Sequence, residues 1–257
     1  MADVVLTKRD QGILTVTLNR PDKRNAMNGE MVAQIVSTLE KAAKDDALRV
    51  IVIRANGLSF CSGLDLRIMA AQREKGEADL GPLEVVLQTL EACPQPTIAA
   101  VQGDAVAGGC ELALYCDIRV AADAARFSLP LARIGLALPV TLTWKLVDII
   151  GVAKTNELLF TGEAVAAETA LKLGMANRVV PAEELDSSVA ALAAHIAQNA
   201  PLSVRAMKAF VQRAVEVRRH LQRDDLETLH RLVRQSADLK EGLAAQREKR
   251  KPIFRGV

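Results

Sequence analysis

Histidine is scarce in this sequence. The 257 residues include three, His195, His220 and His230, and all of them lie in the last quarter of the chain. Hydrolytic sites of the Ser-His-Asp or Cys-His kind use a histidine as the general base. We therefore expect carboxylates, and not histidines, to carry any acid–base chemistry of this protein.

Cysteine is also infrequent, with Cys61, Cys93, Cys110 and Cys116 forming no Cys-x-x-Cys pair. Together with the shortage of histidine, this leaves few ligands for zinc or an iron–sulfur cluster, and we expect no metal site. Widely spaced cysteines are typical of reduced thiols, which favours a cytoplasmic location. The start of the chain lacks the apolar run of a signal peptide.

Neither charge nor aromatic content points to nucleic acid or a membrane. The 33 basic and 31 acidic residues leave a net charge of +2, which argues against a polyanionic partner. Aromatic residues make up 3% of the chain, too few for a platform on which bases stack. No uncharged stretch approaches the length of about 18 residues that suggests a membrane span.

The apolar residues, half of the chain, are arranged in alternating strand and helix patterns. β-Branched runs predict strands, and apolar residues at helical spacing predict a helix over 28–44 and another over 83–93. The expected strands cover residues 4–6, 13–18, 49–54, 97–101, 117–121 and 125–129. This recurrence of strand, turn and helix predicts an α/β fold of repeated ββα units.

The last part of the chain differs, because beyond Pro181 it is almost wholly compatible with helix and Pro201 stands where a new helix would begin. We expect a core over 1–190 and a helical region over 191–257 that packs on the core or on a neighbouring subunit.

Glu111 is the first candidate for chemistry. It follows Gly108-Gly109-Cys110 and precedes Leu112-Ala113-Leu114, so its surroundings are too apolar for a surface carboxylate. Burial raises the pKa of an acid toward values useful in catalysis. An acid in the first turn of a helix is also favoured by the helix dipole alone, and the pattern by itself leaves both interpretations open.

Two glycine-containing segments could approach a ligand closely. Gly108-Gly109 opens a predicted helix, where free N–H groups can bind an anion or a developing oxyanion. The segment Ser59-Phe60-Cys61-Ser62-Gly63-Leu64-Asp65 places a glycine in a turn, with an acid that could cap a helix. Neither segment is specific on its own.

Taken together, six segments resemble the enoyl-CoA hydratase/isomerase (crotonase) superfamily, in the order that this family has them. They are VTLNRPDKRNAMN (16–28), SFCSGLDL (59–66), AAVQGDAVAGGCELALYCDIRVAAD (99–123), ARIGL (132–136), LLFTGEAVAAETALKLGMANRVV (158–180) and EGLAAQREKRKPIF (241–254). The resemblance implies the family's spiral of ββα units with a helical C-terminal region. That region packs family members into homotrimers, often paired as hexamers.

The resemblance also implies a catalytic arrangement. Family members polarise the thioester carbonyl of an acyl-CoA with two backbone N–H groups, which by match belong to Leu64 and Gly108. Glu111 matches the first of two glutamates that act as acid and base. Fixed N–H dipoles aimed at an oxygen that gains negative charge typically contribute a few kcal/mol each.

Coenzyme A enters as part of the substrate, and the resemblance implies no tightly bound cofactor. The residues expected to contact CoA are Lys23, Arg24, Ala26, Ser62, Leu66, Phe254 and Arg255. The basic tail that ends with them could alternatively contact RNA, but its basic run is short and is interrupted by an acid, which disfavours that interpretation.

Position 131 departs from the family pattern. The second glutamate of the hydratases is expected there, and this chain has Leu131. Trp144, the sole tryptophan, is a further candidate for the acyl pocket, although simple core packing explains it equally well.

Four functions remain open at this point: a hydratase with Glu111 as sole acid/base, an isomerase that moves one proton, a decarboxylase that relies on the oxyanion hole, and an acyl-CoA-binding protein without activity. We favour an enzyme of the enoyl-CoA hydratase type.

Overall fold

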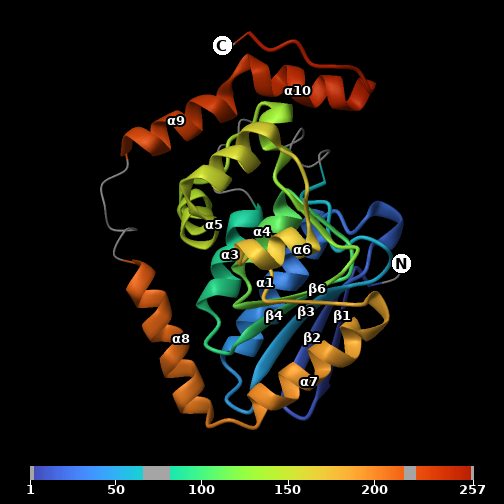
Figure 1. Cartoon of the computed structure of the whole chain (residues 1–257), viewed down its shortest axis with the longest axis vertical. Coiled ribbons are helices and arrows are strands. Elements are labelled where there is room, and N and C mark those ends of the chain that lie inside the picture. Colours follow the sequence, from blue (N-terminus) through green and yellow to red (C-terminus); the bar gives the residue numbers. More distant parts are fainter. Residues whose placement is uncertain (1–2, 66–81, 217–223, 256–257) are drawn as a thin grey trace. The chain divides into compact units, whose positions relative to one another are not determined.

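The computed structural model of the chain describes residues 3–65, 82–216 and 224–255, and it is drawn in Figure 1. The chain divides into two compact units, and each is described by itself. The first contains Met1–Phe127 and Val165–Ala214, and the second contains Ser128–Ala164 and Val215–Val257.

A mixed sheet of six strands, in the order β1-β2-β3-β4-β6-β9, forms the centre of the first unit. β1 and β2 are antiparallel, and each of the following neighbours is parallel. The strands are β1 (Val5–Asp10), β2 (Ile13–Leu18), β3 (Val50–Ala55), β4 (Thr97–Val101), β6 (Ile118–Ala122) and β9 (Arg178–Val180). All six strands expected from the β-branched runs are present in this sheet or the next, which confirms that part of the prediction.

A second sheet of three strands has the order β5-β7-β8. It consists of β5 (Asp104–Val106), β7 (Arg126–Ser128) and β8 (Val165–Ala166). β5 follows β4 closely, and the helix α4 (Gly108–Tyr115) begins two residues after β5 ends. The chain therefore passes from the large sheet through β5 of the small sheet to the start of α4 within seven residues.

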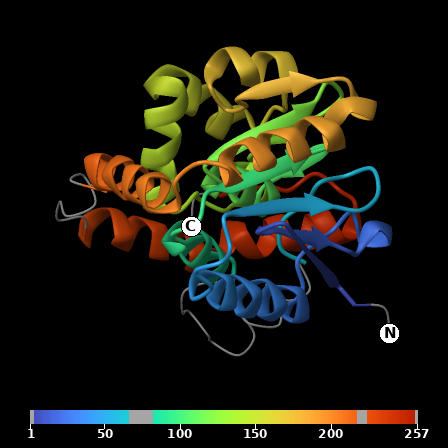
Figure 2. The same cartoon turned by 90° about the horizontal axis from the view of Figure 1, so that it is seen from below.

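The central strands of the large sheet, β3 and β4, are buried on both faces, because helices cover both. Val50 and Val52 of β3 belong to a buried cluster that includes Leu185 and Val189 of α7 (Leu185–Ala197). Alternate residues of a strand point to opposite faces, and Ile51, between the two valines, is also fully buried. Figure 2 shows α7 and α1 (Gly29–Ala43) on opposite sides of the sheet.

Helix α1 begins where the sequence predicts. Asn28 caps α1, since its side chain accepts a hydrogen bond from the backbone N–H of Met31 at 2.9 Å. α3 (Pro82–Ala92) packs against both α1 and α4. The described part of this unit also contains the helical elements η1 (Pro21–Lys23), α6 (Ala167–Leu173), η3 (Ala182–Glu184) and α8 (Pro201–Glu216).

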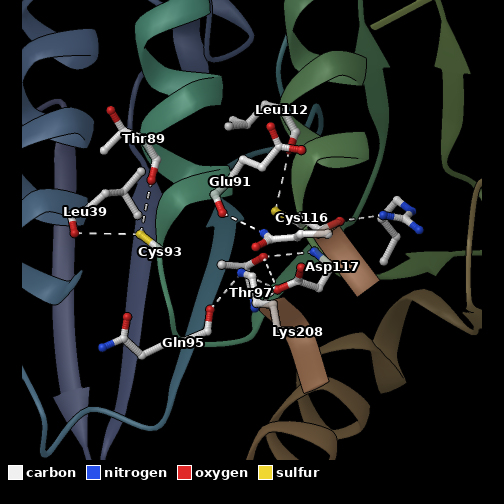
Figure 3. Close-up of polar contacts among 12 residues, drawn as sticks. Leu39, Thr89, Glu91, Cys93, Gln95, Thr97, Leu112, Cys116, Asp117 and Lys208 are labelled. Atoms are coloured by element: carbon white, nitrogen blue, oxygen red, sulfur yellow. Dashed lines mark hydrogen bonds and ion pairs between the residues drawn. The ribbon is translucent and has the colours of Figure 1, made fainter. Parts of the chain in front are cut away.

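A buried lysine attaches α8 to the rest of the first unit, as Figure 3 shows. The Lys208 ammonium lies 2.7 Å from the Asp117 carboxylate and donates to the Gln95 carbonyl at 3.0 Å. The same carboxylate accepts hydrogen bonds from the backbone N–H and the hydroxyl of Thr97, at 2.8 and 2.9 Å. Because Asp117 follows the end of α4, this network ties α8 to that helix and to the start of β4.

The second unit is helical and contains η2 (Pro130–Ile134), α5 (Val140–Thr161), α9 (Asp224–Gln235) and α10 (Ala237–Glu248). η2 and α10 approach each other so closely that a β-carbon at Gly242 would lie 2.4 Å from the carbonyl oxygen of Ile134. α5 bends at Gly151, whose φ of 74° is not helical. Within the part of the chain that is described, no helix is long and apolar enough to cross a membrane.

Candidate active site

Glu111 is a buried acid in the first turn of α4. Every residue of this helix is buried, and Glu111 itself is 3% exposed, as its apolar neighbours predict. Within the residues that the structure describes, no group of three or more His, Cys, Asp or Glu side chains is placed to hold a metal ion.

The surroundings of Glu111 favour its neutral form. Burial raises the pKa of Glu111 to about 8, and the charge of Glu84 adds to the rise. Glu84 lies in the first turn of α3, next to Leu83, whose side chain reaches the start of α4. At neutral pH the Glu111 carboxyl therefore carries a proton that it can donate.

The segment 61–65 lies directly against the start of α4. Cys61 donates its backbone N–H to the Asp104 carbonyl at 3.1 Å, and its own carbonyl accepts from the N–H of Val106 at 2.9 Å. A β-carbon at Gly63, which has a φ of +90°, would lie 3.0 Å from the backbone nitrogen of Gly108. The residue after Gly63 and the first residue of α4 are thus brought together, although they are 44 positions apart.

The orientation of the Leu64 N–H follows from its peptide plane. The Gly63 carbonyl accepts a hydrogen bond from the Met27 N–H at 2.8 Å. In a trans peptide the C=O and the following N–H point in opposite directions, so the N–H of Leu64 points away from Met27. It is not used in the pairing of Met27 with the segment 63–65, in which the Asp65 N–H donates to the Met27 carbonyl at 2.9 Å.

The N–H of Gly108 has no partner within its own helix. Gly108 is the first residue of α4, and the first N–H groups of a helix have no carbonyl partner within it. The preceding Ala107 provides no side-chain cap and has φ 48° and ψ −119°, a conformation that an alanine rarely adopts. Backbone strain of this kind is frequent at functional sites, where the fold maintains it.

The turn over residues 20–27 is built around Asn25, which is fully buried. Its side-chain oxygen accepts from the Arg20 N–H at 2.9 Å, and its amide nitrogen donates to the carbonyls of Asn56 and Ser59, each at 2.8 Å. This places Lys23 and Arg24 on the surface, with Ala26 half-buried beside them. Ser62 joins them, because its N–H donates to the Arg24 carbonyl at 3.0 Å.

The other predicted residues lie in the second unit or outside the described ranges. Leu131 in η2 and Trp144 in α5 are both half-buried, and Phe254 is 41% exposed. The backbone N–H of Arg255 donates to the Asp238 carboxylate at 2.7 Å. Leu66 lies outside the described residues, and the roles of all these residues remain predictions.

Sequence reasoning missed two charged residues near these segments. The sequence predicted a helix over 83–93 but gave Glu84 no role. An acid in the first turn of a helix gives no local indication that it acts on a distant residue such as Glu111. Arg20 was part of a predicted turn, yet its side chain contacts Asp65 across 45 positions. Asp65 itself was expected to cap a helix.

Comparison with known proteins identifies the family. The profile described as "Enoyl-CoA hydratase/isomerase" matches residues 8–257. The chain is 33% identical to the 2,3-dehydroadipyl-CoA hydratase of Escherichia coli over 252 residues, which cover 98% of each chain. It is also 33% identical to the 1,2-epoxyphenylacetyl-CoA isomerase of the same organism over 261 residues, which cover 100% of each chain.

Solved structures agree with this result. A methylmalonyl-CoA decarboxylase in complex with 2-nitronate-propionyl-CoA matches with a TM-score of 0.91 at 26% identity, covering 99% of each chain. An enoyl-CoA hydratase/carnithine racemase from Magnetospirillum magneticum matches with a TM-score of 0.79 at 35% identity, covering 100% of this chain and 97% of the other.

The fold and the matches define an α/β protein of the class that acts on acyl-CoA thioesters. The chain belongs to the enoyl-CoA hydratase/isomerase, or crotonase, superfamily. The predicted family is confirmed, and so is the predicted α/β crotonase fold with a helical C-terminal region. The structure shows that this fold contains two sheets. Because the relatives include a hydratase, an isomerase and a decarboxylase, membership does not select the reaction.

Proposed function

We propose that this protein is an acyl-CoA enzyme of the enoyl-CoA hydratase type, with Glu111 as its sole acid/base. One observation carries the proposal: the buried carboxyl of Glu111, neutral at pH 7, lies three residues after Gly108. Gly108 is the first residue of α4, and its backbone nitrogen lies beside Gly63, the residue before Leu64. The arrangement suits a reaction in which negative charge develops on a carbonyl oxygen and a proton is transferred nearby.

The N–H groups of Leu64 and Gly108 would hold the thioester oxygen. Attack on the β-carbon of an enoyl-CoA pushes electrons from the double bond onto this oxygen and generates an enolate. Backbone donors fixed in advance stabilise that charge without reorganising during the reaction. The dipole of α4, whose positive end lies at Gly108, contributes in the same sense.

Glu111 would complete the addition of water. The water oxygen bonds to the β-carbon and releases a proton to one carboxyl oxygen, while the carboxyl proton on the other oxygen moves to the α-carbon. Protons and charge balance, and Glu111 ends in the protonation state in which it began. In the family pattern a second glutamate shares this work at position 131, and its replacement by Leu131 predicts slower hydration, since such a group typically contributes about 10²–10⁴ in rate.

We further propose that CoA is bound by the turn at Lys23 and Arg24. Both side chains are exposed, and their charges suit the CoA phosphates. The other contacts proposed from the family match are Ala26, Ser62, Leu66, Phe254 and Arg255.

Decarboxylation is the second candidate, favoured by the similarity to the methylmalonyl-CoA decarboxylase structure, with its TM-score of 0.91. In that reaction the bond between the α-carbon and the carboxylate breaks and CO2 leaves. The electrons remain as the thioester enolate, and the neutral Glu111 protonates the α-carbon. This chemistry requires no second acid at position 131. Isomerisation needs one proton carrier as well, and the similarity to the E. coli isomerase supports it as a third outcome of the same test.

Product identification tests the proposal. The wild-type protein and Glu111→Gln are incubated with a panel of short enoyl-CoA thioesters and with a 2-carboxyacyl-CoA, and the products are identified by mass and chromatography. A 3-hydroxyacyl-CoA formed by the wild type alone supports the hydratase. A product with a shifted double bond would contradict the hydratase and identify an isomerase. Release of CO2 would identify a decarboxylase. Tight binding of the thioesters without any product would identify a protein that binds acyl-CoA and does not transform it.

We also propose a homotrimer or a hexamer. On α8 the side chains of Leu202, Met207, Phe210 and Val211 are between 56% and 77% exposed, which is costly for large apolar groups in a monomer. A mass of three or six times 27.7 kDa by light scattering would support this assembly, and a monomer would contradict it.

A further inference from the structure

Arg20 connects two segments that adjoin the proposed oxyanion hole. It lies after the end of β2 and immediately before η1, and its side chain is 17% exposed. One guanidinium nitrogen, Nη1, donates to the Ala26 carbonyl, and both Nη1 and Nη2 lie 3.5 Å from Oδ2 of Asp65. A single planar cation thus holds the segment before Met27 and the residue after Leu64.

These two segments run side by side and determine the orientation of the Leu64 peptide. Three backbone hydrogen bonds join them: Ser62 N–H to the Arg24 carbonyl at 3.0 Å, and the two bonds between Met27 and residues 63 and 65 at 2.8 and 2.9 Å. The bond from Met27 to the Gly63 carbonyl fixes one side of the peptide plane whose other side is the Leu64 N–H. Any shift of Met27 therefore changes the direction of that N–H.

The segment needs this support because glycine precedes Leu64. Gly63 has a φ of +90°, and its backbone can adopt many other conformations at little cost. The charge-assisted contacts of Arg20 act on both sides of this flexible point, on Ala26 and on Asp65. An arginine suits the task, since its rigid fork can bind two acceptors in one plane.

We propose that Arg20 is a positioning residue that holds the Leu64 N–H in line with the N–H of Gly108. The inference rests on the proposed function, in which these two groups bind the thioester oxygen. Misplacement of a catalytic group by about 1 Å can cost about 100-fold in rate. Loss of Arg20 should therefore lower kcat by about tenfold to a hundredfold while KM changes little, because the proposed CoA contacts at Lys23 and Arg24 are retained.

The carbonyl stretch of a bound thioester tests this directly. The probe is butyryl-CoA carrying 13C at the thioester carbonyl, and its infrared difference spectrum is recorded on the wild type and on Arg20→Met, Arg20→Lys and Asp65→Asn. The control is Arg9→Met, which removes an arginine whose ion pair with Asp45 is exposed and lies on the edge strand β1. Circular dichroism and thermal unfolding confirm that each variant is folded.

We expect the bound carbonyl to absorb at lower frequency than free butyryl-CoA in the wild type and in Arg9→Met. In Arg20→Met and Asp65→Asn at least half of that shift should disappear, with an intermediate shift in Arg20→Lys, which keeps the charge and loses the fork. A full shift in a folded Arg20→Met would overturn the inference. If Arg20→Met does not fold, Asp65→Asn, which keeps the side-chain shape, decides in the same way. Absence of any shift in the wild type would instead contradict the proposed oxyanion hole.

Discussion

The backbone of Gly109 lies so close to Cys61 that a β-carbon at Gly109 would stand 2.1 Å from the Cys61 carbonyl oxygen. That oxygen also accepts the hydrogen bond of Val106, so it cannot move without disturbing the pairing of the two segments. Gly109→Ala should therefore separate the segment 61–65 from the start of α4. We expect a loss of about 1–3 kcal/mol in stability and of about 100-fold in turnover, measured by denaturant unfolding and steady-state kinetics.

Gly29→Ala is the matched control. Gly29 is the first residue of α1, and a β-carbon there would meet no atom within 4 Å. Alanine favours a helix by up to about 1 kcal/mol over glycine, so this variant should be as stable as the wild type or more stable. Equal effects of the two substitutions would contradict the close approach of Gly109 and Cys61.

The raised pKa of Glu111 predicts a specific pH dependence. As a general acid, Glu111 must be protonated, and its pKa of about 8 means that the active form predominates at pH 7 and is lost above pH 8. The profile of kcat/KM should therefore fall as the pH rises through about 8. Activity that instead rises through this range would assign the ionised carboxylate as a base, as an isomerase would require.

Leu131→Glu tests the departure from the family pattern. The match to the family predicts that hydratases have their second glutamate at the position that is Leu131 in this chain. We expect the substitution to raise the rate of hydration of a short enoyl-CoA by at least tenfold, within the range of a general acid–base contribution. Leu131→Gln, which is polar but transfers no proton, is the control. No gain in a Leu131→Glu protein that folds and binds CoA thioesters would mean that residue 131 does not adjoin the reacting carbons.

Lys208 stabilises the attachment of α8. Its side chain is 8% exposed, and Lys208→Met would leave the Asp117 carboxylate without this cation and the Gln95 carbonyl without this donor. A hydrogen bond to a charged group contributes about 1.5–3 kcal/mol, and the exposure of the Asp117 side chain, 32%, keeps the combined effect of the two contacts within that range. We expect a loss in this range in urea unfolding, whereas Lys154→Met, which removes an exposed pair with Glu157, should change stability by less than about 0.5 kcal/mol.

Local patterns in the sequence predict the elements of this fold well. β-Branched runs such as Val50–Ala55 predict strands because their side chains fit a buried sheet, and the apolar stripe from Met31 to Leu39 predicts α1. The burial of Glu111 was likewise predictable, since the residues around it in α4 are apolar.

Contacts between distant segments were not predictable from such patterns. Nothing in the periodicity of the chain relates Gly63 to Gly108, and only the resemblance to a family suggested that Leu64 and Gly108 act together. The contact of Arg20 with Asp65 and that of Lys208 with Asp117 depend on how the strands are ordered in the sheet. The sequence around a charged residue gives no local indication of a partner so far along the chain. The contacts of Arg20 and Lys208 were therefore found only in the structure.

Exchange of the α-proton of a saturated acyl-CoA tests the central claim most directly. The claim is that the Leu64 and Gly108 N–H groups polarise a thioester while Glu111 transfers a proton at the α-carbon, and this step is common to hydration and isomerisation. Butyryl-CoA is incubated in D2O at a pD of about 9, where Glu111 is ionised and can remove the α-proton, with the wild type or with Glu111→Gln. Deuterium at the α-carbon is followed by mass spectrometry. We predict incorporation that depends on the wild-type protein and falls by at least 100-fold in Glu111→Gln. Equal incorporation with both proteins, or none with the wild type, would contradict the account.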